Sequence, residues 1–155
     1  MNKRVMLYIN TGITALFVIS LFISFATMEA EGTHQTWVTI TECVGGASIL
    51  LAGISLVYLK DEHRFVPLSI LYFFAPWLLY ALGHEIGFDA STPYVWAWFI
   101  GLYLLLIAGF ILIRMFYFKM HGVYQLIPAV LLFVNGILLV YLLFLQLWWL
   151  LPFGS

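Results

Sequence analysis

Five long apolar runs constrain the fold of this chain more than any other feature of its sequence. Each run has 22 to 25 residues, whereas an α-helix needs about 20 residues to cross the roughly 30 Å hydrocarbon core of a bilayer. We therefore predict an all-α integral membrane protein with five transmembrane helices, at residues 5–27, 37–59, 65–86, 94–118 and 126–150.

The composition agrees with this prediction. Hydrophobic residues make up 65% of the chain and charged residues 8%, whereas soluble domains contain about 45–50% apolar and about 25% charged residues. The first run has 23 residues and exceeds the roughly 7–15 apolar residues of a secretory signal. We interpret it as a retained helix, with a cleaved signal as the minor alternative.

The connections between the runs have at most nine residues. Connections this short make consecutive helices antiparallel neighbours. We expect a five-helix up-down bundle that forms a single transmembrane domain over residues 1–155.

The basic residues predict an orientation. Lys and Arg near the ends of membrane helices stay on the cytoplasmic side. The amino terminus is then cytoplasmic and the carboxyl terminus outside, and we expect the protein in the cell (plasma) membrane. All six basic residues fall at one end of the predicted bundle, at Lys3, Arg4, Lys60, Arg64, Arg114 and Lys119.

The same charges limit the partners. With six basic residues and a net charge of -1, the chain lacks the basic patch typical of nucleic-acid binding. It also contains no glycine-rich phosphate loop for a nucleotide. The lipid bilayer is the expected partner, with other membrane subunits or a second copy of the chain as further candidates.

Candidate metal ligands gather at the opposite, outer end of the predicted bundle. Imidazole and carboxylate groups bind zinc and other borderline divalent ions, so a divalent metal is the candidate cofactor. Their spacing matches no established signature, because His84-Glu85 lacks the second histidine of His-Glu-x-x-His. A site requires that three or four of these groups, from two hairpins, converge; the alternative for the histidine at the membrane end is hydrogen bonding to water or lipid headgroups. The candidate ligands are His84, Glu85, Glu42, Asp89 and His34.

Glu42 is the most informative of these residues. It lies five residues inside Trp37, roughly 7–8 Å below the interface if a helix begins there. An ionisable group at membrane depth indicates a functional site, although a side chain this shallow can also reach water. We expect His84 to be its partner, because the second and third helices are adjacent.

Three further polar residues are predicted inside the helices. Asn135 and Gln146 are eleven residues apart, about three turns, so they face the same side of the last helix. An unpaired amide in hydrocarbon is costly, so they line a polar pore or bond to another helix, and we favour interhelical bonds. Tyr80 and His84 share a face at four-residue spacing and could relay protons, the alternative being interfacial hydrogen bonding.

A stripe of small residues predicts a close helix contact. Gly45, Ser48, Ala52 and Ser55 fall on one face of the second predicted helix. Small side chains let membrane helices approach closely. We expect a helix seam along this face, either within the chain or between subunits.

Catalysis has little support in the sequence, and we assign no catalytic residue. The chain has no Gly-x-Ser-x-Gly motif, and Cys43 has no cationic neighbour in sequence that would activate its thiol. Three functions remain open, in this order: a non-enzymatic accessory subunit or assembly partner of a larger membrane complex, a small cation- or proton-linked carrier or sensor, and a metal-dependent membrane enzyme.

Overall fold

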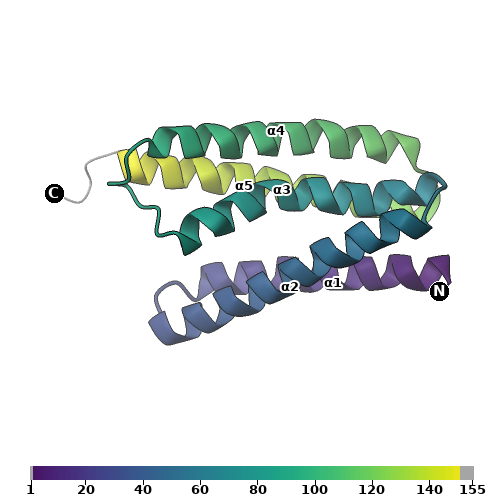
Figure 1. Ribbon diagram of the computed structural model, residues 1–155, viewed down its shortest axis with the longest axis horizontal. Helices are drawn as coiled ribbons and strands as arrows, with labels where there is room; N and C mark the ends of the chain where they lie inside the picture. The colour runs from purple at the N-terminus through teal and green to yellow at the C-terminus, as the bar shows by residue number, and fades with distance from the viewer. Residues whose placement is uncertain (1, 151–155) are drawn as a thin grey trace.

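The computed structural model describes residues 2–150 and contains five long helices joined by short connections (Figure 1). Consecutive helices are antiparallel, and each is long and apolar enough to cross a membrane. The predicted five-helix up-down bundle is confirmed, and the chain is a multi-pass membrane protein. The carboxyl-terminal residues 151–155, predicted to lie on the outer side, fall beyond the described residues. The elements are α1 (Lys3–Ala26), α2 (Glu31–Tyr58), η1 (Glu62–Arg64), α3 (Phe65–Glu85), α4 (Val95–Lys119), η2 (Gly122–Gln125) and α5 (Leu126–Leu150).

The predicted boundaries agree within two residues except at the start of α2. That helix begins at Glu31, six residues before the predicted position. The expected connection over residues 28–36 is therefore wrong for residues 31–36, which are helical, while residues 28–30 do lie in the connection. Polar side chains suggested a loop, but the backbone here is helical: the N–H of His34 donates to the Ala30 carbonyl at 2.8 Å. Six residues add about 9 Å of helix, and His34 lies on α2 rather than in a loop.

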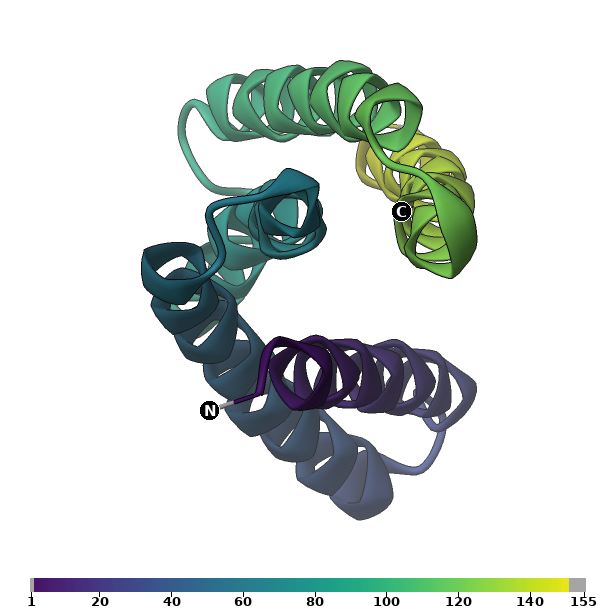
Figure 2. The same ribbon diagram turned by 90° about the vertical axis from the view of Figure 1, so that its right-hand side faces the viewer.

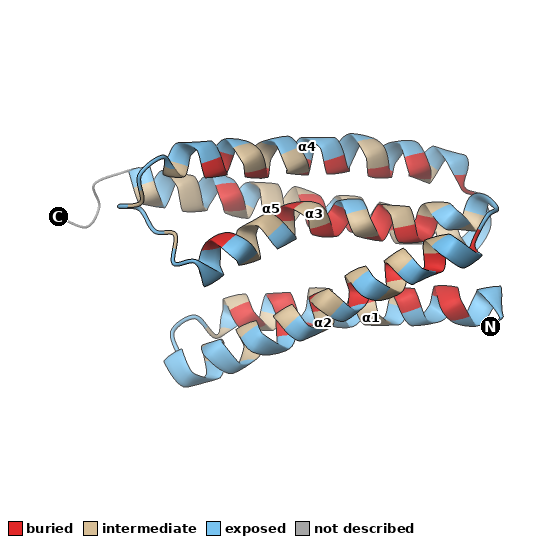
Figure 3. Cartoon of the chain, viewed as in Figure 1, coloured by how far each residue is buried: buried red, intermediate tan, exposed pale blue. Residues whose placement is uncertain are grey.

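The helices follow one another around an open arc (Figure 2). The closest pairs are α1 with α2 and α3 with α4, while α2 with α3 and α4 with α5 make smaller contacts. Helices α1 and α5 form the two ends of the arc. A groove of about 350 Å³ lies between residues 11–19 of α1 and residues 126–131 of α5. Farther along the two helices touch, where the Phe25 and Tyr141 rings stack with centroids 4.6 Å apart. Buried residues lie mainly on the helix faces turned toward neighbouring helices (Figure 3).

Aromatic packing joins α1 to α3 in the interior. The Phe17 ring lies 4.4 Å from the Phe74 ring and 5.0 Å from the Trp77 ring, between centroids. Phe17, Phe73 and Phe74 are fully buried. Aromatic pairs at these separations add attraction beyond the burial of their surface. These ring contacts therefore stabilise the packing of α1 against α3.

The small-residue face of α2 is buried along its whole length, at Gly45, Ser48, Ala52 and Ser55. Gly45 faces α3, since a Cβ atom there would lie 2.5 Å from Cη2 of Trp77. Ser55 faces α1, since its Oγ accepts a hydrogen bond of 2.6 Å from Nδ2 of Asn10. The predicted seam is therefore a contact within the chain.

Two polar contacts close the end of the bundle opposite His34. The Lys3 ammonium donates to the Asp61 carboxylate, and this hydrogen bond holds the pKa of Asp61 below its usual range. Nδ1 of His121 lies 3.2 Å from a carboxylate oxygen of Glu62. The start of α1, the α2–α3 connection and the α4–α5 connection therefore meet at this end.

The approach of α2 to α3 generates a testable pair of substitutions. Gly45→Ala places a methyl group against Trp77, and we expect a loss of about 1–3 kcal/mol of unfolding free energy from overpacking. At Gly46, apart from the adjoining residues and the nearby backbone of α2, no atom of the described residues lies within 4 Å of the place that a Cβ would occupy. Gly46→Ala should therefore be neutral or stabilising by up to about 1 kcal/mol through helix propensity. Thermal unfolding in detergent micelles, followed by circular dichroism, measures both. Equal effects of the two substitutions would contradict the close contact.

Candidate metal centre

Glu42, His84 and Glu85 converge at one end of the bundle, and we call these three residues the His84 cluster. Glu42 comes from α2, and His84 and Glu85 come from the last turn of α3. One ligand atom from each residue lies within 4.8 Å of the other two. Nδ1 of His84 is 3.8 Å from Oε1 of Glu85, and the two side chains are 58% and 63% exposed. The cluster is therefore open to solvent on one side.

The end of α3 positions two of the three ligands. Gly87 has φ of +74°, its N–H donates to the His84 carbonyl, and the Phe88 N–H donates to the Gly83 carbonyl. These two bonds form a Schellman motif, which satisfies the last carbonyls of a helix and requires a left-handed residue. The motif stops α3 directly after His84 and Glu85.

The packing of α2 positions the third ligand. Glu42 adjoins Thr41, which is buried, and it lies three residues before Gly45, where α2 meets Trp77 of α3. Glu42 is half-buried. The contact that brings the two helices together therefore also brings Glu42 beside the end of α3.

A cavity of about 80 Å³ lies beneath the cluster. One water needs about 10–15 Å³ on this measure, so the cavity has room for an ion with several waters. Glu42, His84 and His34 line its polar part, and Trp77 and Tyr80 line its apolar part. The cavity is a chamber between α1, α2 and α3 that the His84 cluster borders.

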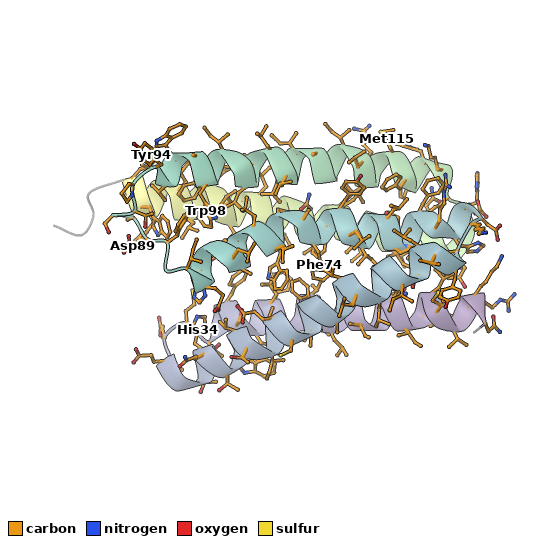
Figure 4. All side chains as sticks on the ribbon, in the orientation of Figure 1. His34, Phe74, Asp89, Tyr94, Trp98 and Met115 are labelled. Atoms are coloured by element: carbon orange, nitrogen blue, oxygen red, sulfur yellow. The ribbon has the colours of Figure 1, made fainter. Side chains whose placement is uncertain are left out.

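His34 lies in the wall of this cavity (Figure 4). Its Nδ1 is 2.9 Å from the Ser24 carbonyl oxygen of α1. Because a carbonyl only accepts hydrogen bonds, Nδ1 carries the proton. His34 is not within the 4.8 Å group formed by the other three residues.

Asp89 lies apart from the His84 cluster, in the α3–α4 connection (Figure 4). Its Oδ1 accepts hydrogen bonds from the backbone N–H of Ser91 at 2.8 Å and from the Ser91 hydroxyl at 2.7 Å. Hydrogen bonds from Ser91 and Thr92 hold the pKa of Asp89 below its usual range. The Asp89 carboxylate therefore bonds to residues of the α3–α4 connection and stabilises the turn there.

Tyr80 and His84 line the same cavity, as their spacing on one helix face suggested. The Tyr80 hydroxyl lies 3.4 Å from that of Tyr141 on α5. Tyr80 and Tyr141 also line a second, smaller cavity of about 50 Å³ deeper in the bundle, among leucines and aromatic rings. Tyr141 was not a sequence candidate, because its contact with Tyr80 depends on how α3 and α5 pack.

Asn135 and Gln146 both bond to α4. Nδ2 of Asn135 donates to the Leu106 carbonyl at 3.2 Å, and Oε1 of Gln146 accepts from the Tyr103 hydroxyl. Both contacts join α5 to α4. They lie away from the cavity beneath the His84 cluster.

The charges of the His84 cluster favour a bound cation. Glu42 and Glu85 present two carboxylates close together, and like charges at this separation repel unless a proton or a cation lies between them. Imidazole and carboxylate ligands together suit zinc and similar borderline ions. Exposure leaves coordination positions open to water.

The Schellman motif supplies a stability prediction. Gly87→Ala forces a side chain into the left-handed region, which costs about 1–2 kcal/mol, although no atom of the described residues lies within 4 Å of the new methyl group. We expect a lower unfolding temperature in micelles for Gly87→Ala. Gly53→Ala, at an equally open position inside α2, is the control and should not destabilise. An unchanged unfolding temperature in Gly87→Ala would show that the end of α3 does not depend on this conformation.

Comparisons with protein-family models, with curated proteins and with solved structures find no match. The geometry of the chain's own residues is therefore the basis on which its function is inferred.

Proposed function

We propose that this protein binds a divalent metal ion at the His84 cluster and acts as a membrane sensor or carrier of that ion. One observation carries the proposal: Glu42 and the pair His84 and Glu85, about 40 residues apart in the chain, place their ligand atoms within 4.8 Å of one another. Both helices contribute ligands. Binding of an ion would therefore link α2 to α3.

The surroundings of the cluster favour a sensor over a carrier. The deeper cavity is lined by leucines, Phe25, Trp77 and the two tyrosines Tyr80 and Tyr141. A dication leaving the carboxylates for such a lining would lose its ligands and its water, at a large cost. Binding at the cluster without passage through the bundle is the simpler function.

The orientation proposed from the sequence predicts which side of the membrane the His84 cluster faces. Under the positive-inside rule, the end of the bundle that carries the basic residues is cytoplasmic. The His84 cluster then faces outside, and the site would respond to ions there. In bacteria or in eukaryotic plasma membranes this is the extracellular or periplasmic side.

Cysteine labelling tests the orientation. In a Cys43→Ser background, Ala90→Cys lies in the exposed α3–α4 connection and Lys60→Cys lies in the exposed α2–α3 connection. A membrane-impermeant maleimide added to intact cells should label Ala90→Cys and leave Lys60→Cys unlabelled. Both should react after permeabilisation. The reverse pattern would place the His84 cluster on the cytoplasmic side.

Metal binding tests the site itself. We expect isothermal titration of the purified protein with Zn²⁺ to show one site. His84→Ala should weaken it by at least about 10–100-fold, since that is the loss when only the outer-shell partners of metal ligands are removed. The matched control is His121→Ala, because His121 is also exposed beside a carboxylate, 3.2 Å from Glu62, but at the opposite end. Equal losses in both variants would mean nonspecific binding.

An accessory subunit of a larger membrane complex is the second candidate function. The groove between α1 and α5, lined among others by Ala15 and Val130, leaves the arc open to a neighbouring transmembrane helix. Native mass spectrometry after gentle extraction separates the two functions. An ion that His84→Ala removes supports the first, and a stoichiometric polypeptide without an ion supports the second. A metal-dependent enzyme would use the same ligands with an ion-activated water.

A further inference from the structure

We propose that His34 supplies a second imidazole ligand to the ion at the His84 cluster, and that the site therefore takes borderline transition-metal dications such as Zn²⁺ in preference to Mg²⁺ and Ca²⁺. This inference rests on the proposed function, since it concerns the same ion. It adds a ligand from the first turns of α2. It also names the chemical class of the ion.

The early start of α2 brings His34 to the site. Residues 38, 41 and 42 follow His34 by four, seven and eight residues, so the four residues lie along one face of the helix. His34, Val38, Thr41 and Glu42 all line the 80 Å³ cavity, together with His84 from α3. The two imidazoles therefore border one chamber from opposite helices.

The hydrogen bond to α1 prepares the ring for metal binding. Because Nδ1 of His34 donates to the Ser24 carbonyl at 2.9 Å, the lone pair of the neutral ring lies on Nε2. Metal-binding histidines characteristically donate their second N–H to a carbonyl or carboxylate, which fixes the tautomer and the orientation of the ring. His34 already has this arrangement.

A movement of α2 would complete the ligand set. His34 is outside the 4.8 Å group of the other three residues, so its Nε2 reaches the ion only if the first turns of α2 move toward α3. The first turns of α2 are exposed (Figure 3), so few contacts oppose this motion. Because His34 bonds to α1, α1 and α2 would move together. Ion binding would then change the angle between this hairpin and α3.

Two imidazoles decide which ions bind well. Mg²⁺ and Ca²⁺ prefer oxygen ligands, whereas imidazole nitrogen favours zinc, copper and nickel. With His34 and His84, the site offers two nitrogens and the carboxylates of Glu42 and Glu85. Zinc with four such ligands is tetrahedral.

Nuclear magnetic resonance of the histidine rings tests the inference directly. The chain has four histidines, and His63 and His121 lie in the connections at the opposite end of the bundle. In protein labelled with ¹⁵N-histidine and held in micelles, Zn²⁺ should shift Nε2 of His34 and a ring nitrogen of His84. The rings of His63 and His121 should stay unchanged, and Mg²⁺ at the same concentration should shift none of the four.

His34→Gln provides the matching affinity measurement. A glutamine amide can still donate to the Ser24 carbonyl but offers no imidazole nitrogen. We expect Zn²⁺ affinity to fall by about tenfold or more and the weak affinity for Ca²⁺ to stay the same. His121→Gln is the control and should change neither.

The outcomes separate this inference from the proposed function. If Zn²⁺ shifts His84 but not His34, and His34→Gln binds Zn²⁺ as tightly as the wild type, the ion site stands and the role of His34 is wrong. If Zn²⁺ shifts neither ring, the proposed function itself is wrong. If Mg²⁺ shifts both rings as strongly as Zn²⁺ does, the inferred selectivity is wrong.

Discussion

The contact between α2 and α3 at Gly45 and Trp77 is the constraint on which the rest of the structure depends. The indole fills the space that a side chain at position 45 would occupy, and the same indole packs edge-on against Phe17 of α1. Lipid provides little hydrophobic drive between helices, so close packing and polar contacts must supply the attraction. Trp77 therefore contacts both helices of the α1–α2 hairpin, beside the contacts of Phe17 with Phe74 and of Phe25 with Tyr141.

Several hydroxyl side chains lie in these contacts with their own protons already paired. They donate to the carbonyl four residues earlier in their own helix, as at Thr41, Ser55 and Ser69. A hydroxyl bonded in this way can lie in an apolar seam at little cost. Ser55 can then also accept from Asn10 of the neighbouring helix. The small-residue face of α2 thus packs against both α1 and α3.

The position of the His84 cluster follows from this packing. Glu42 lies one turn from the crossing point at Gly45, while the Schellman motif at Gly87 ends α3 beside it. The cluster therefore lies at the mouth of a chamber between two closely packed helices, where water has access. A site of this kind can exchange an ion with solvent and transmit its binding to the angle between helices. This arrangement is the reason that we propose a sensor among the candidate functions.

The sequence by itself determined the five helices, because the length of an apolar run and the need to pair every backbone group in hydrocarbon are local properties. It also identified the buried face of α2, because small residues recur there at helical spacing. It misplaced the start of α2, because polar side chains show where the apolar run begins, whereas the helix begins six residues earlier. The sequence also paired Glu42 with His84, because consecutive helices are adjacent, but only the tertiary structure decided that Glu85 joins them and that His34 bonds to Ser24. The Asp89 carboxylate instead bonds to Ser91, two residues away, which is a local contact. The meeting of Glu42 with the end of α3 depends on how α2 crosses α3 at Gly45 and Trp77, and the His34 bond depends on how α2 packs against α1. No local pattern encodes either packing.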